Sequence, residues 1–367
     1  MKRISWIESA LAGYSRASRA LLPSGAAPPP LFYYFLLTYD CDAACPFCYL
    51  KTEGPPPPRA FLPAERVREI LDQIPPRVLV SFSGGEPLLH PDLFACLEYA
   101  ARSHPLSLVT NGLGLDEPVA RRLAALASKS FGRPGLSVLG ISLFESLRGD
   151  KGNAAVARKK NLLALIREAK RKAGSRLPIV DVKVVIREDN LERLDSPREW
   201  LRDGLADVVT YQLESGFLFL PYHDGRIPAL SQAEAWSARR SAQEPRIMDT
   251  ETLRRQVKNL LRSSEAKEGR IRFYPALTED EIARYYSGSG LAEPYVCVFP
   301  WSSLMVTPLG NACQCRNPRP ESLATATLRE AWNGENFRAF RVAASRENVA
   351  SSCAGCCFLK RRYAGFF

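Results

Sequence analysis

The sequence predicts an α/β protein built on a parallel sheet, followed by a small cysteine-rich region. Between residues 31 and 213, six short runs rich in Val, Ile, Leu, Phe and Tyr alternate with stretches of helical character. Several of these runs are apolar almost throughout, which is typical of parallel strands covered on both faces. Six of the ten cysteines lie after residue 296, and this change in composition marks a separate C-terminal region.

The expected strands and helices alternate in the order that parallel βαβ units require. Strands are expected at Leu31–Tyr39, Val78–Ser83, Leu106–Thr110, Leu136–Leu143, Ile179–Ile186 and Asp207–Leu213. Helices are expected at Ala64–Gln73, Asp92–Arg102, Asp116–Ser128, Asn153–Ala173 and Asn190–Arg202, and two more at Thr250–Ser263 and Thr278–Tyr286. Six such units form either a partial barrel or a doubly wound sheet, and the pattern alone does not separate the two.

The composition excludes disordered and membrane-spanning proteins. With 46% hydrophobic and 24% charged residues, the chain is too apolar for disorder. No apolar run approaches the roughly 18–20 residues of a membrane helix. Residues 1–30 are basic and rich in Ala and Ser, without the continuous apolar core of a signal peptide. We therefore expect a cytoplasmic protein, in whose reducing surroundings cysteines serve more often as metal ligands or catalysts than as disulfides.

The first group of cysteines predicts an iron–sulfur cluster. Cys41, Cys45 and Cys48 form the pattern C-x3-C-x2-C directly after the first expected strand. Three thiolates on one short loop can hold three corners of a cubane cluster and leave the fourth iron open. Structural zinc requires a fourth ligand, and no second pair with suitable spacing lies nearby in the sequence. A zinc-binding loop or unligated thiols is the alternative to the cluster.

The cysteine loop resembles that of the radical S-adenosylmethionine (SAM) superfamily, and further motifs strengthen the resemblance. Ser83–Pro87 is similar to the family's GGEP motif and Thr110–Gly112 to its TNG segment. Ser142 ends the fourth expected strand, where the family often places a polar contact to SAM. The resemblance implies a [4Fe–4S] cluster held by three cysteines, with SAM at the open iron. The SAM contacts that it implies are Phe47, Gly84, Gly85, Glu86, Pro87, Thr110, Asn111 and Ser142.

These motifs follow four successive expected strands. The carboxyl ends of barrel strands form the active-site face, so the motifs are expected to meet there. The resemblance covers roughly residues 31–215 and implies a partial (β/α)6 TIM-like barrel. In the family, one electron enters the cluster and SAM is cleaved to methionine and a 5′-deoxyadenosyl radical. This radical then abstracts a hydrogen atom from the substrate.

The second group of cysteines resembles the SPASM/twitch domains that follow the barrel in radical SAM enzymes. Gly310 precedes Cys315 by four intervening residues, and a CxxC pair follows near residue 355. Four cysteines in this order can ligate a complete second cluster, so we expect one auxiliary [4Fe–4S] cluster. A zinc ribbon is the alternative, because four thiolates also suit zinc. The expected ligands are Cys297, Cys315, Cys353 and Cys356, with Cys313 and Cys357 as alternates.

The motifs divide the chain into four expected parts. Residues 1–30 form an N-terminal extension and 31–215 the radical SAM-like barrel. Residues 216–290 form a connecting or substrate-loop region with helices, and 291–367 the twitch/SPASM-like domain. Cys96 belongs to neither cysteine group and is expected to be a buried thiol of a helix.

Three classes of function remain open at this point. The first is an oxidative radical SAM enzyme acting on a small metabolite, because an auxiliary cluster could accept the electron of a substrate radical. The alternative is a radical SAM maturase that crosslinks or oxidises a peptide. The third is a non-catalytic iron–sulfur or zinc protein that binds nucleic acid.

Candidate partners and a candidate base complete the sequence-based expectations. Glu214 lies directly after the sixth expected strand and is a candidate for proton removal from the substrate. A flavodoxin- or ferredoxin-type protein is the expected electron donor. The formal net charge is +11, yet the basic runs on the helix expected at Asn153–Ala173 are typical of a solvated face. No recognised nucleic-acid module is present, so no nucleic-acid partner is expected.

Overall fold

The computed structural model describes residues 2–45, 47–48, 50, 59–143, 149–214, 248–288, 295–314, 320–346, 356 and 358–361. Within them the chain forms a ten-stranded sheet, in the order β11-β10-β9-β1-β2-β3-β4-β5-β6-β7, and a two-stranded ribbon of β8 and β12. The first six strands in chain order are β1 (Phe32–Leu36), β2 (Leu79–Ser83), β3 (Pro105–Thr110), β4 (Gly135–Leu143), β5 (Ile179–Ile186) and β6 (Val208–Leu213).

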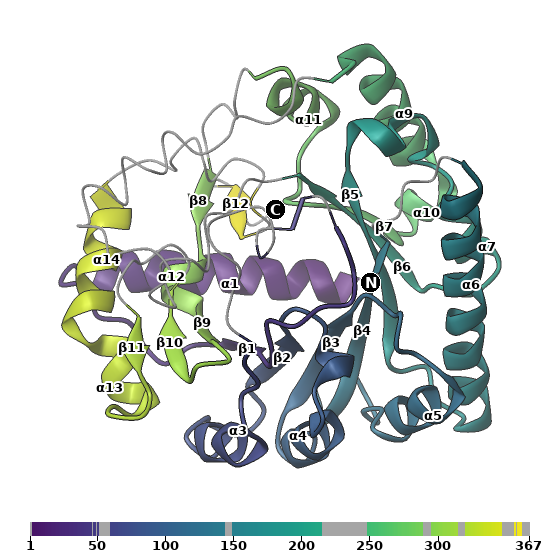
Figure 1. Ribbon diagram of the computed structural model, residues 1–367. Coiled ribbons are helices and arrows are strands. Elements are labelled where there is room, and N and C mark those ends of the chain that lie inside the picture. Colours follow the sequence, from purple (N-terminus) through teal and green to yellow (C-terminus); the bar gives the residue numbers. More distant parts are fainter. Residues whose placement is uncertain are drawn as a thin grey trace.

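All six strands expected from the sequence are present and pair in parallel, each with its neighbour along the chain. β7 (Ile271–Tyr274) adds a seventh parallel strand next to β6. The arrangement is a partial barrel with helices on its outer side, as Figure 1 shows. The choice between a barrel and a doubly wound sheet is therefore settled in favour of the barrel.

Helices cover the outer face of the barrel in the expected order. They are α3 (Ala64–Leu71), α4 (Leu93–Ala100), α5 (Glu117–Ala125), α6 (Gly149–Lys172), α7 (Arg198–Arg202), α9 (Thr250–Arg262), α10 (Ser264–Lys267) and α11 (Glu279–Tyr286). Local signals set their starts. Asp116 caps α5 by accepting a hydrogen bond from the Val119 N–H at 2.8 Å, and Thr278 forms a capping box with Glu281 at the start of α11.

One expected helix is wrong in detail. The stretch 190–202 is not continuous but forms a 3-10 helix, η2 (Glu188–Arg193), followed by the short α7. Pro197 lies at the start of α7. Since proline lacks the N–H that an interior helix position donates, a single helix through residue 197 would lose a backbone hydrogen bond.

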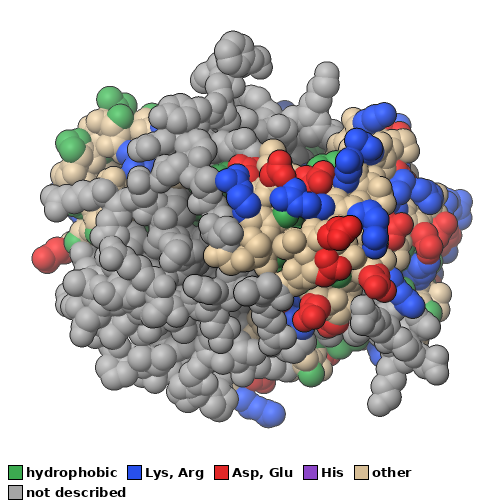
Figure 2. Space-filling model, turned by 90° about the horizontal axis from the view of Figure 1, so that it is seen from above, with side chains coloured by type: hydrophobic (Ala, Val, Ile, Leu, Met, Phe, Trp, Pro, Cys, Tyr) green, Lys and Arg blue, Asp and Glu red, His purple; other side chains and the backbone are tan. Residues whose placement is uncertain are grey.

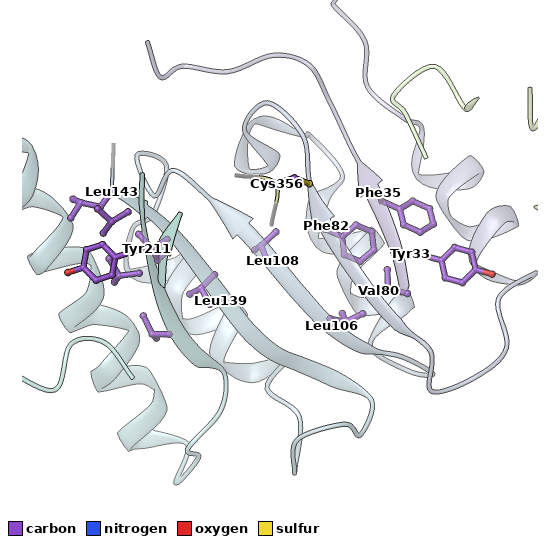
Figure 3. Close-up of a cluster of buried hydrophobic side chains, with 14 of the residues drawn as sticks. Tyr33, Phe35, Val80, Phe82, Leu106, Leu108, Leu139, Leu143, Tyr211 and Cys356 are labelled. Atoms are coloured by element: carbon purple, nitrogen blue, oxygen red, sulfur yellow. The ribbon is translucent and has the colours of Figure 1, made fainter. Parts of the chain in front are cut away.

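The core lies between the sheet and the outer helices. Figure 3 shows its side chains projecting from neighbouring strands, among them Phe35 of β1, Phe82 of β2 and Leu108 of β3. All three are fully buried. Cys96 is also fully buried on α4, where burial raises the pKa of its thiol to about 12. The alternation along each strand leaves the other face of the sheet to line the barrel interior.

The strands of the C-terminal region continue the barrel sheet instead of forming a detached domain. β9 (Ser303–Val306) pairs in parallel with β1, and β10 (Asn311–Cys313) and β11 (Glu321–Ser322) follow as antiparallel strands. β8 (Tyr295–Cys297) and β12 (Leu359–Arg361) form the separate ribbon. The C-terminal region is thus fixed to the first strand of the barrel.

The N-terminal extension contains a long helix, α1 (Lys2–Leu21), that packs on α12 (Phe299–Ser302). In Figure 1, α1 runs from the middle of the barrel, where the N-terminus is marked, toward α14 (Glu335–Arg346). Among the described residues, no helix is both long and apolar enough to cross a membrane.

A buried arginine joins the extension to the C-terminal helices. Arg341 of α14 is fully buried and donates to the carbonyl oxygens of Pro300 (2.7 Å), Gly25 (3.0 Å) and Trp332 (2.8 Å). Its guanidinium also lies over the Trp332 ring, 4.0 Å from the centroid. Trp332 lies near the end of α13 (Leu328–Asn333) and donates in turn to the Pro28 carbonyl at 2.7 Å. These contacts hold three chain segments together around one cation.

Figure 2 shows how charge is distributed on one face of the molecule. On the described surface at the right of this view, basic and acidic side chains are interspersed. Exposed ion pairs among the described residues, such as Lys160–Glu199 and Arg122–Glu98, also combine basic and acidic side chains. Exposed pairs of this kind add little to stability, about 0–1 kcal/mol each. On this surface, the excess of positive charge therefore does not gather into one basic patch.

Candidate functional site

The candidate site lies at the carboxyl ends of the barrel strands. The loop after β1 carries Cys41, Cys45 and Cys48, and all three thiols are partly exposed. The Cys48 N–H donates to the Cys45 carbonyl at 3.2 Å, so the second half of the motif is a tight turn. A short loop with three accessible thiols at the active-site face suits a cubane cluster, since each thiolate of such a cluster binds a different iron. Within the described ranges, no three Cys, His, Asp or Glu side chains are placed to hold one metal ion.

Two glycines bring the loop after β2 against the segment that precedes Cys41. The Gly85 N–H donates to the Thr38 carbonyl at 2.6 Å, and the Glu86 N–H donates to the Asp40 carbonyl at 2.7 Å. A Cβ at Gly85 would lie 2.2 Å from the Asp40 oxygen, and one at Gly84 would lie 2.4 Å from the Thr38 oxygen. Gly84 also has φ +143°, a conformation that other residues rarely adopt. Only glycine fits both positions.

Glu86 is the centre of a buried hydrogen-bond network. Its side chain is 1% exposed. One carboxyl oxygen accepts from the Thr110 hydroxyl (2.5 Å) and the Leu88 N–H (2.9 Å), and the other accepts from the Asn111 N–H (2.7 Å). Burial raises the pKa of Glu86, while these hydrogen bonds oppose the rise. The next residue, Pro87, is buried and starts a single 3-10 turn. Glu86 therefore joins the loops after β2 and β3.

Asn111 brings the loop after β3 to the cysteine loop. Its side-chain Nδ2 donates to Asp42 Oδ1 at 2.7 Å and lies 3.9 Å from Cys41 Sγ. Its Oδ1 accepts from the Leu113 N–H at 2.7 Å, which fixes the orientation of the amide. The structure thus brings together the cysteine, GGEP and TNG motifs, as expected from their positions after successive strands.

Ser142 lies in β4, next to the last residue of the strand, and faces the barrel interior opposite Lys183 of β5. Its carbonyl accepts a short hydrogen bond from Lys159 Nζ. Lys159 lies on the outer helix α6 and is only 1% exposed. Its ammonium group reaches inward to the end of β4. No local pattern indicates this contact, because Lys159 stands inside a basic run that is typical of a solvated face.

Arg187 is a site residue that the sequence reasoning missed. It follows β5 directly, and its guanidinium lies over the Phe47 ring, 5.0 Å from the centroid. Its Nη1 donates to Glu214 Oε1 at 2.8 Å and its Nε to Asp189 at 3.2 Å. A charged residue directly after an apolar strand was the available signal. Glu214, the candidate base, is therefore held in an ion pair at the end of β6.

Two tyrosines of α11 fix the ends of β5 and β6. The Tyr286 hydroxyl donates to the Ile186 carbonyl at 2.7 Å and accepts from the Glu214 N–H at 3.0 Å. The Tyr285 hydroxyl donates to the Glu214 carbonyl. Burial raises the pKa of both phenols, so they remain protonated donors. The position of Glu214 is thus set by tertiary contacts from a helix more than 60 residues away.

The C-terminal cysteines lie partly within the described residues. Cys297, Cys313 and Cys356 are described, whereas Cys315, Cys353 and Cys357 lie outside the described residues. Cys297 pairs with Leu359 across the β8–β12 ribbon, and Cys356 lies three residues before Leu359. Two of the expected auxiliary ligands therefore come from adjoining segments.

An apolar cluster connects the two cysteine regions. Its buried members include Tyr39, Phe299 and Cys313, and both Cys48 and Cys297 pack against it. Cys313 is fully buried on β10. The loop of the first cysteine group and the first cysteine of the second group thus share one packing surface.

Comparison with known proteins agrees with this arrangement. The model of the radical SAM superfamily matches residues 35–200, and that of the SPASM iron–sulfur cluster-binding domain matches residues 297–357. Mycofactocin maturase MftC of Mycobacterium ulcerans is 33% identical over 99 residues, which is 26% of this chain and 26% of that protein. PqqA peptide cyclase of Gluconobacter oxydans is 32% identical over 173 residues, covering 45% of this chain and 44% of that protein. These matches therefore span about a quarter to less than half of the length of the relatives.

A solved structure shares the fold over most of the chain. Streptococcus suis SuiB, crystallised with its precursor peptide SuiA, superposes with a TM-score of 0.57 at 17% identity. The match covers 88% of this chain and 69% of that one. At this identity the likeness shows the fold alone.

The chain belongs to the radical SAM superfamily of enzymes. More particularly, it is a radical SAM protein with a C-terminal SPASM iron–sulfur domain, whose strands here extend the barrel sheet beyond β1.

Proposed function

We propose that this protein is a radical SAM enzyme that modifies a peptide. The observation that carries the proposal is the similarity to MftC and to PqqA peptide cyclase, which are named for a maturation and a peptide cyclisation. SuiB, which shares the fold, was crystallised with a precursor peptide. The relatives thus favour the peptide-modifying alternative over the oxidation of a small metabolite that the sequence first suggested.

We propose that Cys41, Cys45 and Cys48 hold the [4Fe–4S] cluster. When bound, the cluster and SAM supply a 5′-deoxyadenosyl radical that abstracts a hydrogen atom from the substrate. The Asn111 amide, directed at Cys41, supplies a hydrogen-bond donor to the sulfur. Partial exposure of the three thiols leaves room for a fourth, non-protein ligand.

Side chains at the strand ends position SAM in this proposal. The contacts are Phe47, Gly84, Gly85, Glu86, Pro87, Thr110, Asn111 and Ser142. Gly84 and Gly85 serve this role by letting the loop after β2 lie directly against the Thr38 and Asp40 carbonyl groups, next to the cysteine loop. Glu86 acts chiefly by holding Thr110 and Asn111, since three internal donors already occupy its oxygens. Arg187 keeps the Phe47 ring and Glu214 in place, and Glu214 serves as the proton acceptor only if this ion pair opens.

The auxiliary region is proposed to hold one [4Fe–4S] cluster on Cys297, Cys315, Cys353 and Cys356, with Cys313 and Cys357 as alternates. The shared packing of Cys48 and Cys297 supports electron transfer between the two regions. A flavodoxin- or ferredoxin-type protein would supply the first electron. In this proposal the two cluster-binding parts are residues 31–215 and residues 291–367.

The test is anaerobic and uses the reconstituted full chain. With dithionite and SAM, the protein should form 5′-deoxyadenosine, measured by liquid chromatography and mass spectrometry. Short reading frames beside the gene are the source of candidate precursor peptides, and addition of the true precursor should yield a product whose mass differs from that of the peptide. A Cys45→Ala variant should form no 5′-deoxyadenosine, whereas Cys96→Ala, changed in a fully buried helix position, is the matched control. Absence of SAM cleavage by the fully loaded protein would instead favour a non-catalytic metal protein.

A further inference from the structure

The inner face of the barrel carries an ionic cluster below the candidate site. The register places Gly140 of β4 opposite Asp181 of β5, Lys183 opposite Thr210 of β6, and Thr210 opposite Arg272 of β7. Side chains at these positions point to one face of the sheet, because partners in a ladder share a face. Four adjacent strands therefore contribute to one polar patch inside the barrel.

Asp181 is the centre of this patch. Its side chain is only 4% exposed. It accepts from the Thr210 hydroxyl at 2.6 Å, from Lys183 Nζ at 2.9 Å and from Arg272 Nη2 at 3.2 Å. Gly140 makes room for the lysine, since a Cβ there would lie 2.8 Å from Lys183 Cε. The absence of a side chain at Gly140 thus leaves space for the Lys183 cation inside the barrel.

The charges of this patch do not balance. Two cations, Lys183 and Arg272, face the single carboxylate of Asp181, which leaves one positive charge in excess. Arg272 Nε is buried and finds no hydrogen-bond partner among the described residues. Lys183 and Arg272 are each 23% exposed and share one carboxylate, so the net positive charge of the patch favours an anionic ligand. Ser137 Oγ, buried in the wall of the same cavity, is a second donor without a described partner.

A cavity of about 410 Å³ gives access to this patch. Asp181, Lys183, Thr210 and Arg272 line it, together with Arg77, a third cation. Apolar side chains also line it, among them Leu31, Phe131 and Phe358. The volume lies within the range of small-ligand sites, roughly 300–1,000 Å³, and the combination of apolar walls with a few polar groups is typical of them.

The cavity lies toward the amino ends of the strands, since Phe32, Leu79 and Pro105 line it, and on β5 it extends as far as Lys183. Lys183 precedes Arg187 by four residues along β5 and its continuation. At about 3.3 Å per residue, this spacing corresponds to roughly 13 Å. An extended segment of about four residues that passes the strand ends could therefore place its far end at the ionic patch.

We propose that this cavity binds a carboxylate of the substrate between Arg272 and Lys183. The inference rests on the proposed function, because it takes the substrate to be a peptide. The carboxylate belongs either to an acidic side chain or to the C-terminus of the peptide. It supplies the missing negative charge, while the apolar wall contacts the adjoining part of the chain.

Peptide capture by the anaerobic holoenzyme tests this inference. The probes are acetylated tetrapeptide pools with three randomised positions: a terminal Glu amide, a terminal Gln amide and a terminal Gln with a free carboxyl group. After ultrafiltration, mass spectrometry should show at least tenfold greater retention of the Glu amide or of the free acid than of the Gln amide. The pool that is retained identifies the source of the carboxylate. Equal retention of all three pools would overturn the inference.

Variants tie the preference to the cavity. Arg272→Gln and Lys183→Gln should each reduce the preference for the carboxylate at least tenfold. Arg255→Gln, which removes an exposed arginine on α9, is the control with the same change of charge and should keep it. If Arg272→Gln fails to fold by circular dichroism, Lys183→Gln decides the matter. A folded variant with an undiminished preference would refute the assignment.

The two proposals can fail separately. Formation of 5′-deoxyadenosine by the same wild-type preparation tests the radical SAM chemistry independently of the carboxylate site. If SAM is cleaved but the three pools are retained equally, the carboxylate site is refuted and the enzyme class stands.

Discussion

Replacement of Glu86 by glutamine should weaken the hydrogen bonds that hold the candidate site together. The two side chains have nearly the same size, so packing is preserved. One carboxyl oxygen becomes an NH2 group, while the oxygens accept from two backbone N–H groups on opposite sides, those of Leu88 and Asn111. Whichever way the amide is turned, one of these N–H groups faces another donor. Since a buried donor without a partner costs about 1–3 kcal/mol, the free energy of unfolding should fall by that amount.

The pH dependence of this effect has a defined sign. Burial raises the pKa of Glu86 above its ordinary value of 4.5. The folded protein therefore holds this proton more tightly than the unfolded chain does, and the contribution of Glu86 to stability falls as pH rises above about 4.5. Glutamine does not titrate. The stability difference between wild type and Glu86→Gln should thus be larger near pH 4.5 than near pH 7.

Urea unfolding of the anaerobic holoprotein, followed by tryptophan fluorescence at several pH values, measures both effects. Glu69→Gln on α3 is the matched control, because the Glu69 side chain is 56% exposed. The iron content of each variant reports whether displacement of Asn111 loosens the cysteine loop. If Glu86→Gln were as stable as Glu69→Gln at every pH, the buried network would not have the role assigned to it here.

Three further substitutions test other parts of the structure. Cys45→Ala should lower the iron content by about four atoms per chain, measured after anaerobic reconstitution, while Cys96→Ala should retain it; equal iron in both would exclude the first loop as a cluster site. Gly85→Ala should also lose iron from the first cluster, because its Cβ would collide with the Asp40 carbonyl oxygen at 2.2 Å, and unchanged iron and SAM cleavage would contradict this. Arg341→Leu should lower the free energy of unfolding, measured by denaturant titration, by roughly 3–5 kcal/mol, because several buried carbonyl groups lose their donor. A loss below about 1 kcal/mol would show that the fold does not depend on this cation.

The sequence by itself determined the strands of the barrel and the motifs that follow them. Apolar runs of strand length and the C-x3-C-x2-C spacing are local properties of the sequence. They can therefore be recognised without knowing how the rest of the chain folds. The meeting of the motifs at one face of the barrel then follows, because parallel strands bring their carboxyl ends to that face. Cys41, Glu86 and Asn111 meet for this reason, as expected.

Tertiary structure decided the features that depend on partners far away in the sequence. No local pattern shows that β9 pairs with β1, that Arg187 contacts both Phe47 and Glu214, or that Arg341 is buried among carbonyl oxygens. In each case the favourable interactions come from groups that are distant in the sequence and close in space, and not from neighbours in the chain. The same holds for Lys183 and the rest of the ionic patch. The partners of a single charged residue in a strand depend on which side chains the neighbouring strands place beside it.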